Sequence, residues 1–133
     1  MPRPKRKRFL ASPPSIDGLK PFGVPMKNLE PVVLLFEEYE AIKLADYEGL
    51  SQLEAAKQME VSRPTFTRIY EKARKSMAQS MVEGKALLIE GGNYYTTKCW
   101  YKCRHCKKVN VSDDAISNCP SCQSNRIIHL NER

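Results

Sequence analysis

Apolar and polar positions alternate with a helical period in the first half of the chain, beginning after Pro31. Between residues 35 and 48 the apolar side chains recur every three or four positions, which places them on one face of a helix. These residues are Leu35, Tyr39, Ile42 and Ala45. Gly49 then predicts the end of this helix.

Two further helices are predicted, with a short break between them. Ser51 and Glu54 have the spacing of a capping box, in which each side chain can satisfy an unpaired amide of the other. They predict a short helix that runs to about Met59. Ser62 predicts the cap of a third helix, and Pro64 is tolerated in its first turn.

The third helix combines an apolar stripe with a basic outer face. The stripe predicts a buried side made of Phe66, Ile69, Ala73, Met77 and Met81. The outer side holds Thr65, Arg68, Lys72, Lys75 and Gln79, and Arg63 and Thr67 flank its first turn. A core on one side and positive charge on the other are therefore expected.

The two ends of the chain follow other patterns. Residues 1–31 hold most of the prolines, which resist helix formation, so we expect an extended basic arm there. After Gly84, short strands are predicted over 86–89, 94–101 and 126–130, with a hinge at Gly91-Gly92. The pattern thus predicts a mainly α domain over 32–90 and a small β domain over 91–133.

Charge separates the same regions. Residues 1–30 carry a net +5, residues 31–92 a net −2 and residues 93–133 a net +4, which gives the total of +7. This distribution suggests a polyanionic partner, whereas tails that only keep the protein soluble are the alternative. No apolar run approaches the roughly 18 residues of a membrane helix, and no apolar stretch follows the basic N-terminus. We expect a cytoplasmic protein associated with the nucleoid.

A short helix, a tight turn and a second helix are the arrangement with which many proteins enter the DNA major groove. Arginine can bond a guanine edge with two hydrogen bonds, and lysine can neutralise phosphates. The predicted contacts on and before the third helix are Ser62, Arg63, Thr65, Thr67, Arg68, Lys72 and Lys75; those in the arm are Arg3, Lys5, Arg6, Lys7 and Arg8. A three-helix bundle with a solvated basic face is the alternative.

Several motifs resemble an uncharacterised prokaryotic family of predicted DNA-binding proteins. The chain begins Met-Pro-Arg-Pro, continues with Lys-Pro-Phe-Gly-Val-Pro at 20–25, and carries the family-like segments 37–51, 54–56, 61–66 and 84–92. The resemblance covers residues 1–92 and implies a helix-turn-helix similar to the C-terminal DNA-reading domain of sigma factors, in three-helix or winged form. It also matches Ser62 and Arg63 to the start of the recognition helix, and Thr67 and Arg68 to base-facing positions.

The chain departs from the family in two places. Members usually have glycine in the turn, where this chain has Glu60, and a left-handed backbone there costs a non-glycine residue about 1 kcal/mol. Members often have a cysteine near the position of Lys7. Because this chain has a lysine there, no redox or metal role is expected for the arm.

Four of the five cysteines form two CxxC motifs separated by twelve residues. They are Cys103, Cys106, Cys119 and Cys122. Two residues between ligands let a tight turn aim both sulfurs at one ion, and four thiolates are the preferred ligands of a closed structural zinc site. We therefore expect one zinc ion in a zinc ribbon. A redox-active dithiol is the alternative, but it needs only one CxxC at a helix start.

The remaining chemistry of the tail is open. Cys99 is expected to be a free thiol, His105 is a weak ligand candidate, and His129 on the last strand is expected at the surface or in packing. An aromatic and basic cluster can hold phosphates, stack bases or supply the core of the small domain. It comprises Trp100, Tyr101, Lys102, Arg104, Lys107 and Lys108.

The function expected from these features is sequence-specific binding of double-stranded DNA by a transcriptional regulator, with a homodimer at two half-sites as a common arrangement. The alternative is a zinc-ribbon adaptor that binds a protein, for example one of the transcription machinery. An enzyme is not expected, since the sequence offers no nucleophile–base pair and no open metal site.

Overall fold

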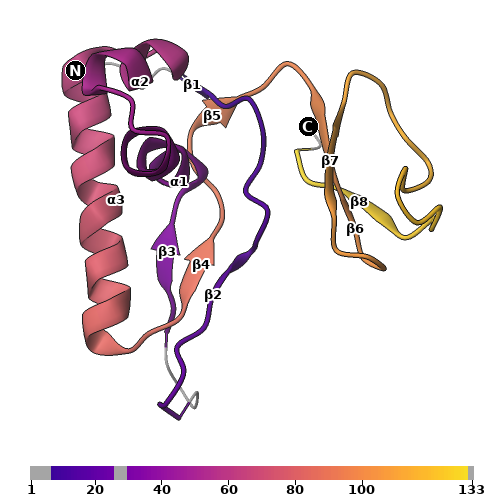
Figure 1. Cartoon of the computed structure of the whole chain (residues 1–133), viewed down its shortest axis with the longest axis horizontal. Coiled ribbons are helices and arrows are strands. Elements are labelled where there is room, and N and C mark those ends of the chain that lie inside the picture. The colour runs from indigo at the N-terminus through magenta and orange to yellow at the C-terminus, as the bar shows by residue number, and fades with distance from the viewer. Residues whose placement is uncertain (1–6, 26–29, 132–133) are drawn as a thin grey trace, which may run out of the picture. The chain divides into compact units, whose positions relative to one another are not determined.

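The computed structural model describes residues 7–25 and 30–131, which divide into two compact units (Figure 1). Unit 1 comprises residues 1–10 and 16–95, and unit 2 comprises residues 11–15 and 96–133. The division falls after Tyr95, whereas the sequence pattern suggested a hinge at Gly91-Gly92. None of the helices in the described ranges is long and apolar enough to cross a membrane.

Unit 1 contains the predicted helices together with small sheets, so the chain is mixed α/β rather than mainly α in its first part. The helical elements are α1 (Phe36–Ile42), a π-helical turn η1 (Lys43–Tyr47), α2 (Gln52–Gln58) and α3 (Arg63–Glu83). The π-helical turn was not predicted. It is closed by a bond from the Glu48 N–H to the Lys43 carbonyl, and it widens the end of the first helix.

Local capping residues set the ends of α2 and α3. The Ser51 hydroxyl accepts from the Glu54 N–H at 3.2 Å, and the Ser62 hydroxyl accepts from the Thr65 N–H at 3.3 Å. Both N-terminal caps are as predicted, although the Glu54 carboxylate accepts from the Ser51 hydroxyl. The long helix α3 ends at Gly84, whose φ of 66° is the left-handed conformation that glycine takes without strain.

The apolar side of α3 packs on a three-stranded sheet in the order β2 (Gly18–Leu19), β4 (Leu87–Ile89), β3 (Val32–Leu34). The β2–β4 pair is antiparallel and the β3–β4 pair is parallel. Buried residues of this layer are Val32, Leu34, Ala73, Leu87 and Ile89. Phe66 and Ile69 are buried as predicted, whereas Met81 is 80% exposed and lies outside the core.

The described part of the predicted arm belongs to unit 1 except for residues 11–15, which belong to unit 2. Strand β1 (Arg8–Phe9) pairs in parallel with β5 (Tyr94–Tyr95), and the Phe9 N–H donates to the Met59 carbonyl at the end of α2. Strand β2 belongs to the sheet below α3. Residues 8–10 and 17–19 are therefore held by backbone pairing, because distant strands supply the partners that the proline-rich sequence lacks locally.

Unit 2 is built on a three-stranded antiparallel sheet in the order β7 (Val109–Ser112), β6 (Cys99–Cys103), β8 (Ile127–His129). The predicted strand over 94–101 is divided between β5 and β6, and β7 was not predicted. Trp100 and Tyr101 are buried on the central strand, and the ring of His129 stacks on Tyr101 at a centroid distance of 4.7 Å. Both aromatics form the core of this small unit.

Candidate metal centre and the surface of helix α3

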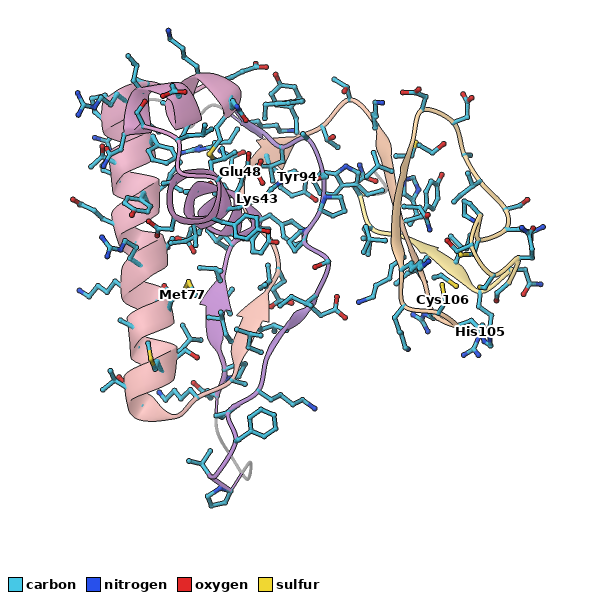
Figure 2. All side chains as sticks on the ribbon, viewed as in Figure 1. Lys43, Glu48, Met77, Tyr94, His105 and Cys106 are labelled. Carbon is cyan, nitrogen blue, oxygen red and sulfur yellow. The ribbon has the colours of Figure 1, made fainter. Side chains whose placement is uncertain are left out.

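Four cysteine sulfurs converge at one end of the unit 2 sheet. The Sγ atoms of Cys103, Cys106, Cys119 and Cys122 all lie within 4.8 Å of one another. Cys103 ends β6, and Cys106 lies in the turn that follows it, where Figure 2 labels it beside His105. The described cluster does not include Cys99 or either histidine. Four thiolates so close together are consistent with a metal site.

The two CxxC turns have the same backbone. In each, the residue after the second cysteine is left-handed, with φ of 67° at Lys107 and 64° at Gln123. In each, the N–H of that residue donates to the carbonyl of the first cysteine, at 2.9 Å. The N–H of the first cysteine donates to the carbonyl five positions later, Lys108 in one turn and Ser124 in the other. Each turn is thereby closed around its pair of sulfurs.

Backbone amides favour the thiolate form of the first cysteine in each turn. The Cys106 N–H lies 3.4 Å from the Cys103 sulfur and lowers the pKa of that thiol. The Cys122 N–H acts in the same way on Cys119 and lowers its pKa to about 6. The thiolate is the form that ligates metal, so Cys103 and Cys119 favour a bound cation, whereas burial and hydrogen bonds to the neighbouring sulfurs raise the pKa of Cys122 to about 11.

The predicted DNA contacts on α3 differ in exposure and in their partners within the protein. Arg63, Arg68, Lys75, Ser62 and Lys72 are exposed, and Thr65 and Thr67 are half-buried. Five of the seven have side-chain partners within the described part of the protein: Ser62, Thr65, Thr67, Arg68 and Lys72. The caps use Ser62 and Thr65, and the Arg68 guanidinium reaches the Thr65 hydroxyl at 3.3 Å.

Thr67 and Lys72 are held by neighbouring helices. The Thr67 hydroxyl donates to the Gln52 side chain at 2.5 Å and so ties α3 to α2. The Lys72 ammonium lies 3.4 Å from the buried Glu38 carboxylate, although two thirds of the lysine side chain is exposed. A base-facing role for Thr67 does not fit this geometry, because its hydroxyl is turned toward α2.

The sequence predicts Arg8 as a DNA contact, but in the structure this residue is not available to DNA. Its side chain is buried, and its guanidinium lies 3.5 Å from the Glu37 carboxylate of α1. Glu37 also accepts from the Asn93 N–H at 2.6 Å, and a Cβ on Gly92 would come within 2.3 Å of that carboxylate. Lys7 is exposed. Arg3, Lys5 and Arg6 lie outside the described residues.

Three buried acids on α1 were missed by the sequence analysis. Glu37, Glu38 and Glu40 are each no more than 5% exposed. Glu40 lies 3.5 Å from Lys43, but burial dominates and raises the pKa of its carboxyl group. Their spacing held a signal, since Glu37 precedes the buried Ala41 and Leu44 by one and two helical turns.

The comparisons with known proteins all lead to one family. The family model described as "Protein of unknown function DUF134" matches residues 1–97. A UPF0251 protein of Chloroherpeton thalassium is 43% identical over 129 residues, covering 96% of this chain and 85% of the relative. A UPF0251 protein of Caldicellulosiruptor saccharolyticus is 47% identical over 127 residues, covering 96% and 88%.

A third relative matches a shorter stretch of the chain. The UPF0251 protein of Thermoanaerobacter pseudethanolicus is 53% identical over 94 residues, which cover 71% of this chain and 80% of the relative. No solved structure matches the chain. On the extent of these matches, the chain belongs to the UPF0251/DUF134 family.

Proposed function

We propose that the protein binds double-stranded DNA in a sequence-specific manner and acts as a transcriptional regulator, with α3 as its reading helix. The observation that carries this proposal is the exposure of Arg63 and Arg68 on the first turns of α3, while Phe66 and Ile69 bury the other side. A short helix, a turn and a longer helix that presents its N-terminal side chains form the helix-turn-helix arrangement of DNA-binding proteins.

Internal pairing of the acids supports this proposal. Unit 1 has many carboxylates, but Glu37 and Glu38 are buried beside Arg8 and Lys72. Glu40 lies 3.5 Å from the ammonium of Lys43. The negative charge of α1 is thus partly compensated inside the protein, and the exposed arginines at the start of α3 remain available to a polyanion.

We propose zinc as the ion of the cysteine cluster, with a structural role. Four cysteine thiolates in a closed set are the preferred ligands of structural zinc, and they leave no open position for catalysis. An unoccupied coordination position is what metal-dependent catalysis requires, so a binding role fits this set better than an enzymatic one.

The test begins with selection of bound duplexes from a random pool, followed by measurement of affinity for the selected site and a scrambled site at fixed salt. Arg63→Ala and Arg68→Ala are expected to reduce the preference for the selected site, since an arginine–guanine pair contributes about 1–3 kcal/mol of discrimination. Footprinting of the selected site reports whether two copies occupy half-sites about one DNA turn apart.

Arg74→Ala is the matched control. Arg74 lies on the same helix, but its guanidinium packs over the Tyr70 ring at 5.4 Å. The variant removes the same charge and is expected to keep the base preference. If Arg63→Ala and Arg68→Ala lower the affinity for both duplexes equally, α3 is not the reader, and an adaptor that binds protein becomes the better description.

A further inference from the structure

The two CxxC turns of unit 2 share a backbone but differ in charge. Their four non-cysteine positions are Arg104, His105, Lys107 and Lys108 in the first turn, and Pro120, Ser121, Gln123 and Ser124 in the second. The first turn has three permanent positive charges, and the second has none. The fold of the turn and the placement of its sulfurs therefore do not require the basic side chains.

The basic residues are also exposed. Arg104, His105, Lys107 and Lys108 are all exposed, and so is Arg126, whose carbonyl accepts from the Arg104 N–H at 2.7 Å. We name these five residues the basic knuckle. In the part of the chain that the structure describes, none of them forms an ion pair with a carboxylate.

The acids of the hairpin lie at its opposite end. The register pairs Lys102 with Val109 near the basic knuckle and Cys99 with Ser112 at the far end. Asp113 and Asp114 directly follow Ser112, and Asp113 lies 3.4 Å from the ammonium of Lys98. The hairpin is thus polarised, with positive charge concentrated beside the cysteines.

We propose that the basic knuckle binds the phosphate backbone of duplex DNA and supplies sequence-independent contacts in addition to those of α3. This inference rests on the proposed function. A phosphate partner fits better than a protein partner, because protein interfaces have an apolar centre. Among the described residues, the exposed large apolar side chains include none from residues 103–108 or 126.

The sharpest test transfers the neutral residues of the second turn to the first. Gln123 shows that glutamine suits the left-handed position of Lys107, so Lys107→Gln removes charge without changing what the turn demands. Lys108→Ser is the corresponding change at the next position. The probe is a fluorescein-labelled duplex of random sequence, and the full chain is titrated by anisotropy over a range of salt concentrations.

Removal of one phosphate contact is expected to reduce the magnitude of the log–log salt slope by about 0.9. Lys107→Gln/Lys108→Ser should therefore reduce it by up to about 1.8, weaken binding to all duplexes alike and leave the preference for the selected site unchanged. The control Lys98→Gln removes a lysine from the acidic end of the hairpin and is expected to keep the slope.

A competing explanation is that the basic side chains neutralise the metal site and do not bind phosphate, because zinc with four thiolates has a net charge of −2. The zinc content of each variant is therefore measured together with its salt slope. An unchanged slope overturns the proposal, whether zinc is retained or absent. A reduced slope with zinc retained supports it, even if Arg63→Ala and Arg68→Ala leave base preference unchanged and so contradict the reading role of α3.

Discussion

The Tyr95 hydroxyl of β5 donates a hydrogen bond to the carboxylate of Glu60, in the turn that joins α2 to α3. Glu60 has a left-handed backbone, with φ of 58°. The N–H of Val61 donates to the Ala56 carbonyl, and the Glu60 N–H donates to that of Lys57, which is the Schellman pattern that usually places glycine at this position. Glu60 thus makes a side-chain hydrogen bond at a position where the left-handed backbone alone would favour glycine.

Glu60→Gly is expected to stabilise the protein once the tyrosine partner is removed. In a Tyr95→Phe background, the substitution relieves a left-handed strain of about 1 kcal/mol. The free energy of unfolding, measured in urea, should rise by about that amount. Glu60→Ala in the same background is the control, since it removes the carboxylate and keeps the Cβ. An equal gain from alanine would contradict the strain argument.

Glu40→Gln is expected to stabilise unit 1 at neutral pH. Burial raises the pKa of Glu40 in the folded state, so the carboxyl group adds stability below its ordinary pKa of 4.5, and that stability is lost as pH rises through the folded pKa. Glutamine resembles the neutral form. Its advantage should be largest near pH 7 and should fade below pH 4.5, as measured by unfolding across that range. A gain that does not depend on pH would contradict this account.

Arg8 is expected to affect the stability of the protein, whereas the residues before it are expected to affect DNA binding. Arg8→Ala leaves the Glu37 carboxylate buried without its cation, which costs about 3–5 kcal/mol of stability. Deletion of residues 1–7 removes four positive charges and keeps the Arg8–Glu37 pair. It should preserve the unfolding transition and reduce the salt slope of DNA binding by about 0.9 for each phosphate that the arm neutralises. A lower melting temperature after the deletion would contradict this separation.

One zinc ion per chain is expected after purification under reducing conditions without chelator. Cys103→Ser or Cys119→Ser should abolish tight zinc binding and the fold of unit 2, while the helical circular dichroism of unit 1 persists. Cys99→Ser is the control and should retain the ion, because Cys99 lies outside the four-sulfur cluster. Elemental analysis of the three variants checks this, and loss of zinc from the control would contradict the four-ligand assignment.

Features with local causes could be predicted from the sequence. The Ser51 and Ser62 caps depend on residues three positions away, and the cysteine turns depend on a spacing of two residues. Features with distant partners could not be predicted. Strand β1 is only two residues long and pairs with residues 94–95, so no periodicity marks it. The ion pair of the buried Glu38 likewise involves Lys72 of another helix, which turns one predicted phosphate contact partly inward.

The pairing of β1 with β5 has a consequence for how the chain is made. Synthesis proceeds from the N-terminus, so Arg8 and Phe9 leave the ribosome long before Tyr94 and Tyr95, their partners. The helices between them can form from local contacts, but the first strand must wait until residue 95 has emerged. Strand β1 is therefore the last part of this pairing to form, and a nascent chain halted before Tyr95 should keep Arg8 and Phe9 sensitive to protease.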